Sequence, residues 1–180
     1  MTGCGKSTIA KRLAKKYGLR YLSGGGALKA LAIASGYKPG GRGWWETEEG
    51  TRFLEQRMTD PQFDKRVDEG LIKEAKRGNI VLDSWTIPWL LKEGFKVWLE
   101  ASPEVRARRI AERDDISLEK AFDALKEKDE KTKAIYKNLY GFDLGEDLSP
   151  FNVVLDTNEL GVEEVFQTLC LVIERLLLKP

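Results

Sequence analysis

The residues best suited to chemistry stand at the beginning of the chain, in the stretch MTGCGKSTIA. Gly5, Lys6 and Ser7 match the end of the phosphate-binding motif G-x-x-x-x-G-K-[ST]. Glycines leave the backbone open to an anion, and the start of the following helix offers free N–H groups and partial positive charge. The sequence therefore predicts that the phosphates of ATP are bound by Gly3, Cys4, Gly5, Lys6, Ser7 and Thr8.

Two side chains of this loop have distinct tasks. We expect Lys6 to reach the β- and γ-phosphates and Ser7 to place its hydroxyl on Mg²⁺. The alternative is a glycine-rich helix start that carries a Lys-Ser pair by chance. The helical pattern and the alternating strands and helices that follow favour phosphate binding.

The motif is incomplete at its start. Its first glycine would stand one residue before Met1, and the strand that precedes a P-loop is also absent from the sequence. Such a strand is central to this type of sheet. We therefore expect the natural protein to begin about ten residues earlier, with an apolar strand.

The elements that must position this loop alternate along the chain. Apolar runs predict strands over 19–23, 79–83, 95–101 and 151–157. Helical spacing and capping residues predict helices over 7–16, 24–36, 51–58, 60–78, 102–114, 117–140 and 161–179, with a glycine-rich loop over 37–50. Because strands alternate with helices, we expect one α/β domain over 1–180 whose parallel sheet is covered on both faces.

Three charged residues fall where such a fold places ligands. Asp83 ends the apolar run NIVLD, and the carboxyl ends of parallel strands border the ligand crevice. Arg109 and Arg113 lie four residues apart, so they share one face of a helix end. The alternatives are a turn-capping aspartate and a solvated basic helix face, and we expect Arg106 and Arg108 to lie on the surface.

Composition excludes several classes of function. The net charge is +1, which gives no overall attraction to nucleic acid or to an anionic membrane. Histidine is absent, so histidine catalysis and histidine metal sites are excluded. The two cysteines, Cys4 and Cys170, make no disulfide framework. We expect a cytoplasmic protein that is a monomer or a weak dimer and acts on small molecules.

Four longer stretches resemble one known family. They are TGCGKSTIAKRLAKKYGLRYLSGG, DPQFDKRVDEGLIKEAKRGNIVLDS, VWLEASPEVRARRIAERD and YKNLYGFDL. In order and spacing they resemble the P-loop nucleoside monophosphate kinases, most closely the archaeal type of cytidylate kinase. The resemblance implies a three-layer α/β/α P-loop fold, ATP and Mg²⁺, and transfer of the γ-phosphoryl group to a nucleoside monophosphate, CMP or dCMP. It also implies a helical insert for the acceptor over 24–77 and a short lid over 109–120.

The resemblance assigns tasks to individual residues. Arg109 and Arg113 match the family pattern R-x-x-x-R, which implies that Arg109 brackets the nucleotide base and Arg113 reaches phosphates. Together with Lys6, these arginines form the expected catalytic set. The aspartate that matches Asp83 helps to hold Mg²⁺ in the family, so we expect Ser7 and Asp83 at the metal.

The acceptor region departs from the family pattern. Where the family has S-A-G-D-x-F-R, this chain has SGGGALK, so Gly26 and Lys29 replace an aspartate and an arginine. Ser84-Trp85 and Glu69-Gly70 also replace residues that include arginines, and arginines expected in the long helix fall near Lys128 and Lys133. Lysine and arginine are not equivalent where a planar fork holds phosphate. The acceptor-binding candidates are Lys29, Arg42, Arg52, Arg57, Asp83 and Trp85.

Trp44 and Trp45 lie beside the arginines of the insert in the sequence. They either stack on a base or anchor a packed core.

The departures in the acceptor region keep three functions open. A nucleotide kinase is the leading hypothesis. A kinase of the same fold with a non-nucleotide acceptor is the second, and a nucleotide-binding regulatory module without phosphoryl transfer is the third.

Overall fold

The computed structural model describes residues 1–41 and 43–177, so the candidate Arg42 lies outside the described residues. The elements in chain order are α1 (Lys6–Lys16), β1 (Arg20–Ser23), α2 (Gly24–Ala34), the 3-10 helix η1 (Trp44–Glu46), α3 (Glu48–Thr59), α4 (Gln62–Ala75), β2 (Ile80–Asp83), α5 (Ile87–Leu90), β3 (Val97–Glu100), α6 (Pro103–Asp114), α7 (Leu118–Tyr140), β4 (Val153–Asp156) and α8 (Val162–Leu176). The alternation of strands and helices expected from the sequence is confirmed.

Local sequence explains where most of these helices begin. Ser23, Thr47, Ser102 and Ser117 each stand at an N-cap, and each side chain accepts a hydrogen bond from the backbone N–H of the third residue of its helix. Such caps satisfy donors that the helix itself leaves free. Helix α1 begins differently, because Gly5 precedes it in the left-handed conformation, with φ of 84°.

The strands form two separate parallel pairs. β1 pairs with β2, with Ser23 beside Asp83, and β3 pairs with β4, with Glu100 beside Asp156. The sequence predicted a parallel sheet without its central strand, and the parallel pairing is confirmed. Among the described residues, no strand bridges β2 and β3. The strand expected before Gly3 has no counterpart among these residues, and the earlier start stays a prediction.

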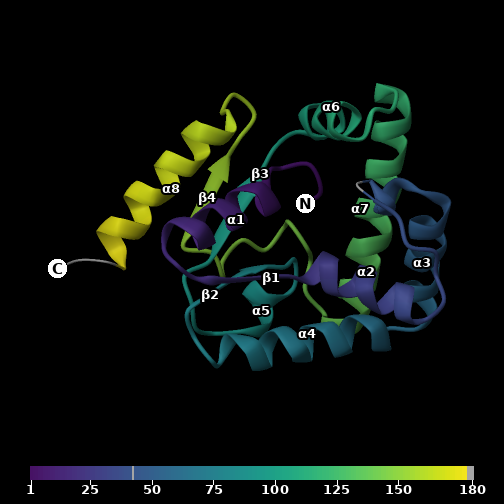
Figure 1. Ribbon diagram of the computed structural model, residues 1–180, viewed down its shortest axis with the longest axis horizontal. Helices are drawn as coiled ribbons and strands as arrows, with labels where there is room; N and C mark the ends of the chain where they lie inside the picture. The colour runs from purple at the N-terminus through teal and green to yellow at the C-terminus, as the bar shows by residue number, and fades with distance from the viewer. Residues whose placement is uncertain (42, 178–180) are drawn as a thin grey trace.

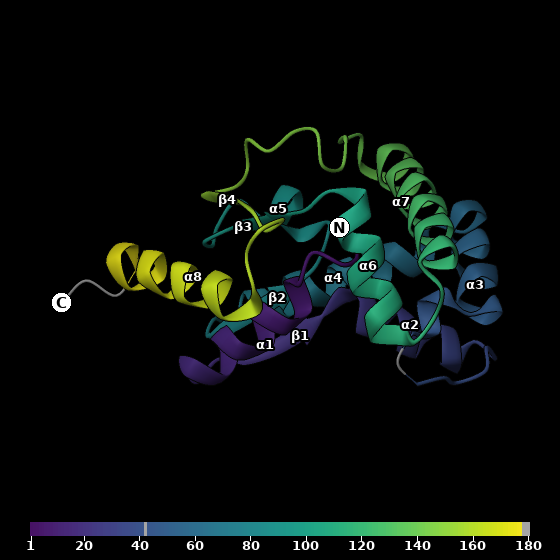
Figure 2. The same cartoon turned by 90° about the horizontal axis from the view of Figure 1, so that it is seen from above.

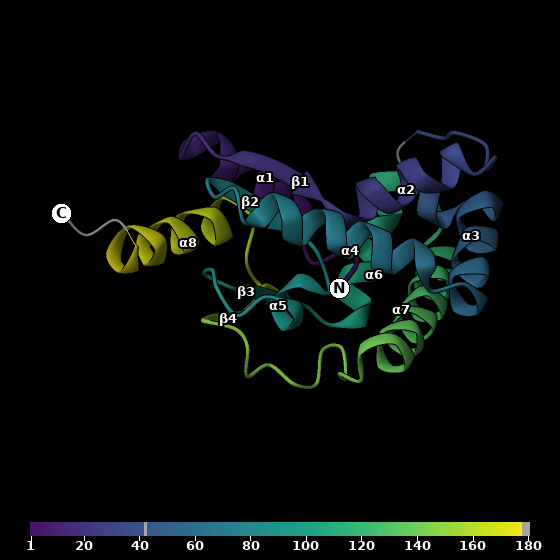
Figure 3. The same cartoon turned by 90° about the horizontal axis from the view of Figure 1, so that it is seen from below.

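Helices flank the strands on several sides. Figure 1 shows α1 above and α4 below the β1–β2 pair. Figures 2 and 3 show α8 at one end of the molecule and α3 with α7 at the other. The predicted insert over 24–77 contains α2, η1, α3 and α4, and the predicted lid over 109–120 is the end of α6 with the start of α7. Their functional roles stay predictions.

Separate apolar clusters fix the two ends of the molecule. One cluster joins α1, β3 and α8 through residues that include Ile9, Leu99 and Leu169. A second holds the insert together around Trp44 and Phe53, both almost fully buried. The insert therefore has its own core, which supports residues at one end of the cleft described below.

One expectation about the surface is wrong. Arg106 is only 7% exposed, because its guanidinium pairs with Asp129 of α7 at 2.6 Å and donates to the carbonyl of Ala101. A partner 23 residues away makes this burial possible, and burial without it would be costly. Within the described ranges, no helix is long and apolar enough to cross a membrane.

Candidate active site

One cavity of about 750 Å³ receives residues from most elements of the fold. It runs along the loop before α1, the start of α2, η1, the end of α6, α7 and the segment after β4. The predicted site residues that it brings together are Gly3, Cys4, Gly5, Lys6, Ser7, Thr8, Lys29, Arg57, Asp83, Trp85, Arg109 and Arg113. Arg52 is the described candidate that lies outside the cavity lining.

The glycines before α1 shape the predicted phosphate loop. Gly3 and Gly5 have φ of 80° and 84°, a region that side chains disfavour. A Cβ at Gly3 would lie 2.8 Å from the carbonyl oxygen of Arg106, so the loop also packs too closely for a side chain there. The first turn of α1 lines the cavity, where its free N–H groups suit an anion.

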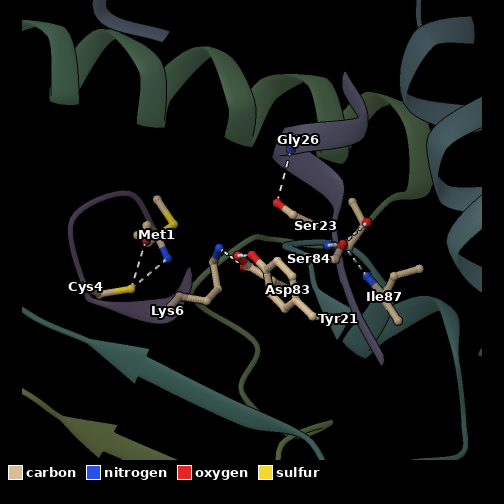
Figure 4. A network of polar contacts seen from close by, with 10 residues as sticks. Met1, Cys4, Lys6, Tyr21, Ser23, Gly26, Asp83, Ser84 and Ile87 are labelled. Carbon is tan, nitrogen blue, oxygen red and sulfur yellow. Dashed lines mark hydrogen bonds and ion pairs between the residues drawn. The ribbon is translucent and has the colours of Figure 1, made fainter. Parts of the chain in front are cut away.

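Lys6 and Asp83 meet at the edge of β2. The Lys6 ammonium pairs with Oδ1 of Asp83, and the Tyr21 hydroxyl donates to Oδ2 at 3.0 Å. Figure 4 shows Lys6 and Tyr21 on either side of this carboxylate. Asp83 is 3% exposed, so an unpaired charge there would be costly. The sequence placed both residues in the cleft without predicting that they pair.

The charge state of Asp83 follows from its neighbours. Burial alone would raise the pKa of the Asp83 carboxyl. The Lys6 ammonium and hydrogen bonds from Ser7 and Tyr21 outweigh burial, so this pKa lies below its ordinary value. Burial and the Asp83 charge raise the pKa of Tyr21 to about 12, so that its hydroxyl stays a donor. Asp83 is therefore an ionised carboxylate beside the Ser7 hydroxyl.

This pair of oxygen groups fits a hard cation. Mg²⁺ takes oxygen ligands and commonly uses one or two protein groups together with substrate phosphates and water. Within residues 1–41 and 43–177, no cluster of three or more His, Cys, Asp or Glu side chains could hold a metal ion. A site of Ser7 and Asp83 completed by phosphates agrees with that finding.

Arg109 borders the loop after β4. Its guanidinium donates to Oγ1 of Thr157 at 3.1 Å and to the carbonyl oxygen of Thr157 at 2.5 Å. Thr157 is 1% exposed and donates in turn to the carbonyl of Glu100. The planar guanidinium is thus fixed at the cavity wall, where its Nη2 also donates to the carbonyl oxygen of Leu160 at 3.5 Å. A fixed planar cation can lie against a flat base.

Arg113 lies at the lid end of α6 and holds two carboxylates. Its Nε donates to Asp114 at 2.8 Å, and its Nη2 lies 3.4 Å from Glu46 of the insert. Glu46 also faces Lys128 of α7 at 3.4 Å. These contacts join the lid, the insert and α7 around the cavity. Sequence reasoning missed Glu46 because it lies in a loop-like stretch without a motif.

The insert end contains a rigid ion pair. Arg57 forms two hydrogen bonds with Asp64, at 3.0 and 2.7 Å, and a third with the hydroxyl of Tyr136 at 3.3 Å. Arg57 and Asp64 are 3% and 2% exposed, so this fork is fixed in the protein. Asp64 was not a candidate from sequence, because its partner lies on another helix.

The remaining candidates occupy different positions. All three candidate tryptophans line the cavity, but Trp44 is buried and its indole donates to the carbonyl of Lys38 at 2.9 Å, whereas Trp45 and Trp85 are half-buried. Lys29 donates to the carbonyls of Gly40 and Gly41. Arg52 lies on the outer side of α3 and pairs with Glu49 at 2.7 Å. The structure therefore brings Lys29, but not Arg52, to the cleft.

A glycine loop before a helix, its lysine paired with a strand-end carboxylate, and a neighbouring helical segment that lines the same cavity are the features expected of a P-loop nucleoside monophosphate kinase. The model of the cytidylate kinase-like family matches residues 1–159. Cytidylate kinases of Ignicoccus hospitalis and Methanocaldococcus jannaschii are 36% and 34% identical to the chain. The match to the Ignicoccus protein covers 93% of this chain and 91% of that protein. The match to the Methanocaldococcus protein covers 98% of this chain and 95% of that protein.

A third relative, a cytidylate kinase of Pyrococcus horikoshii, is 33% identical over 92% of this chain and 81% of its own length. The fold is also similar to a solved one, the crystal structure of an uncharacterized protein from Eubacterium ventriosum, with a TM-score of 0.59. The two sequences are 16% identical, and the match covers 96% of this chain and 92% of that chain. That likeness concerns the fold alone. The chain belongs to the cytidylate kinase-like family and is a nucleotide kinase, which confirms the resemblance found in the sequence.

Proposed function

We propose that the protein transfers the γ-phosphoryl group of ATP to CMP or dCMP. The observation that carries this proposal is one shared cavity, which is lined by the Lys6 loop and by residues of the insert such as Lys29 and Arg57. Phosphoryl transfer needs donor and acceptor in line, and a shared cleft allows that arrangement. The names of the relatives, all cytidylate kinases, support a cytidine nucleotide as the acceptor.

The donor end is assigned as follows. The backbone from Gly3 to Thr8 surrounds the phosphates of ATP, and Lys6 leaves Asp83 to contact the β- and γ-phosphates. Arg109 lies against the base. Arg113, at the C-terminal end of α6 beside Glu46 of the insert, lies between the donor and acceptor ends, where it can contact the acceptor's phosphate and stabilise the charge that develops on the transferred group. This reaction requires little covalent chemistry from the protein, so positioned cations are the main catalytic tool.

Mg²⁺ would be held by the Ser7 hydroxyl and the Asp83 carboxylate, whose lowered pKa keeps it ionised at neutral pH. The ion, when bound, neutralises phosphate charge. Asp83 would also serve as the partner of Lys6 before the phosphates bind, a role that the Lys6–Asp83 ion pair supports. A buried carboxylate that changes partner in this way is never left without a cation.

The acceptor end is assigned to the insert. Trp45 and Trp85 supply flat apolar walls for a base, and Arg57 presents a guanidinium that Asp64 holds in place. Lys29 is available only when it leaves the carbonyls of Gly40 and Gly41. We place the enzyme in the cytoplasm, as a monomer or weak dimer that does not act on nucleic acid, because the net charge is +1 and both thiols are buried and free.

Release of ADP over a panel of acceptors tests the proposal. The panel contains CMP, dCMP, UMP, AMP and GMP, together with small alcohols and coenzyme precursors. We expect the highest kcat/KM with CMP or dCMP. If no nucleoside monophosphate raises ADP release above the rate in buffer alone, the proposal fails.

A second candidate has one observation in its favour. The cations near the acceptor end already have partners, because Arg57 pairs with Asp64, Lys128 faces Glu46, and Lys29 donates to carbonyls. A site whose charges are largely balanced also suits a small acceptor without a phosphate. Turnover of a non-nucleotide acceptor in the same panel, with none of the monophosphates, would decide for this candidate.

A further inference from the structure

Glu46 has an unusual position for a carboxylate. It is the last residue of η1, its side chain is 8% exposed, and it lines the cavity. Its Oε2 lies 3.4 Å from Nη2 of Arg113, and its Oε1 lies 3.4 Å from Nζ of Lys128. One carboxylate thus bridges two cations that come from α6 and α7.

Both contacts are long for ion pairs. Charge-assisted hydrogen bonds are usually about 2.7–2.9 Å, and Arg113 reaches that length with Asp114, at 2.8 Å. Burial lowers the pKa of Lys128, in spite of the neighbouring Glu46 carboxylate. The charge on Lys128 is therefore only partly compensated. A ligand with more negative charge than a carboxylate would bind this pair of cations better.

The location indicates which ligand this is. Nζ of Lys128 lies 5.1 Å from the ring centroid of Trp45, and the guanidinium carbon of Arg57 lies 5.9 Å from the same ring. The bridge therefore lies at the insert end of the cavity, whereas Lys6 and Asp83 mark the donor end. A phosphate group can bridge two cations through separate oxygens, as the Glu46 carboxylate does here.

We propose that Glu46 occupies, in the empty cleft, the place that the acceptor's phosphate takes between Arg113 and Lys128, and that the acceptor displaces it. The inference rests on the proposed function and deepens it, because it names the groups that bind the acceptor's phosphate. Glu46 partners Lys128, whose side chain is 14% exposed, and adds a second carboxylate to Arg113, which also pairs with Asp114. It also selects against acceptors without a phosphate, because only a dianion offers both cations a better partner than the carboxylate.

Binding measurements separate this effect from catalysis. CMP, cytidine and ATP·Mg²⁺ are titrated by calorimetry into the parent, Glu46→Gln, Lys128→Met and the double variant. Removing the competing charge in Glu46→Gln should tighten CMP binding about fivefold, roughly 1 kcal/mol. Cytidine and ATP·Mg²⁺ should bind as they do to the parent. Lys128→Met should weaken CMP binding about tenfold or more, and the gain from Glu46→Gln should shrink in the double variant.

The chain offers a matched control. Glu55 of α3 faces Lys131 of α7 at 3.3 Å, so it also joins the insert to α7, but it lies outside the cavity lining. Glu55→Gln should leave the affinity for CMP unchanged. If Glu46→Gln does not fold by circular dichroism, Glu46→Asp replaces it, since its shorter side chain cannot span both cations and should also tighten CMP binding.

The outcomes are distinguishable. If the parent phosphorylates CMP and Glu46→Gln binds CMP with equal or lower affinity, displacement is wrong and the proposed function stands. If Glu46→Gln tightens ATP·Mg²⁺ but not CMP, the carboxylate stands in for a donor phosphate and the inference is also wrong. If the parent neither binds nor phosphorylates CMP, both proposals fail.

Discussion

The two ends of the cleft are built by different means. The predicted phosphate loop is a run of consecutive residues, with two glycines in the left-handed conformation and one ion pair, Lys6–Asp83. The insert end is assembled from side chains of η1, α3, α4, α6 and α7, whose contacts span up to 82 residues of sequence. A binding site made of backbone groups should tolerate substitution of distant residues. A site made of ion pairs requires both side chains of each pair. The following variants break or sharpen that contrast.

Breaking the ion pair under the insert should have the largest effect. Asp64→Ala leaves the Arg57 guanidinium buried without its carboxylate. Loss of one partner of a buried pair costs about 3–5 kcal/mol of stability, because the remaining charge is uncompensated. We expect a correspondingly lower midpoint in urea, measured by tryptophan fluorescence.

The double variant Arg57→Met/Asp64→Leu controls for this effect. It replaces both charges with apolar groups of similar size, and we expect it to recover much of the lost stability. Its affinity for CMP should stay low if Arg57 contacts the acceptor. A stable double variant with parental affinity would make the pair purely structural.

At the donor end of the cavity, Lys6→Ala should lower the catalytic rate more than it changes the folded structure. The variant loses the cation expected at the β- and γ-phosphates, so we predict a fall in kcat/KM of about 10²–10³-fold. Lys15→Ala, an exposed lysine of the same helix α1, is the matched control and should behave as the parent does. If Lys6→Ala binds ATP·Mg²⁺ as firmly as the parent, the phosphate assignment is wrong.

The contrast also explains what could be predicted from the sequence. The loop before α1 was recognisable because glycine spacing, a lysine and a hydroxyl are local properties. The helix starts at Ser102 and Ser117 were equally local. Asp83 was correctly placed in the cleft, because a residue that ends a buried strand has few other locations.

Other features depend on partners that no local pattern reveals. Arg106 was expected on the surface, but Asp129 allows its burial. Glu46 and Lys128 meet only because η1 folds against α7. Arg52 and Arg57 are alike in sequence, yet one faces outward and the other is buried with Asp64. The separation into two strand pairs was also missed, since pairing requires knowing which strands are neighbours.

Two aspartates, Asp83 and Asp68, have pKa values that are shifted in opposite directions. Lys6 helps to hold the pKa of Asp83 below its ordinary value, whereas burial raises the pKa of Asp68, behind the insert end, to about 6. Asp68 accepts hydrogen bonds from Thr86 at 2.5 Å and Tyr140 at 2.7 Å, which only partly offset burial. Because its proton is bound more tightly in the folded state, the contribution of Asp68 to stability is full below about pH 4 and is lost as the pH rises through about 6.

Comparison with Asp68→Asn isolates this titration. The free energy of unfolding of the parent, minus that of the variant, should rise as the pH falls from about 7 to about 4, by at most roughly 3 kcal/mol. Carboxylates common to both proteins cancel in the difference. Urea unfolding at several pH values measures it. A difference that is flat with pH, or that rises toward alkaline pH, would show that Asp68 is not protonated preferentially in the folded protein.

The smallest effect is expected from substitution of Arg52. This variant tests whether the residues that line the cavity are the ones that bind the acceptor. Its guanidinium lies outside the cavity lining and pairs with Glu49 one turn earlier on the same exposed face of α3. Such pairs contribute little, because water screens both charges. We expect Arg52→Ala to retain kcat and KM for CMP within about twofold. A large rise in KM would require α3 to turn toward the substrate on binding, and the acceptor end would then not be the rigid region that the Arg57–Asp64 pair implies.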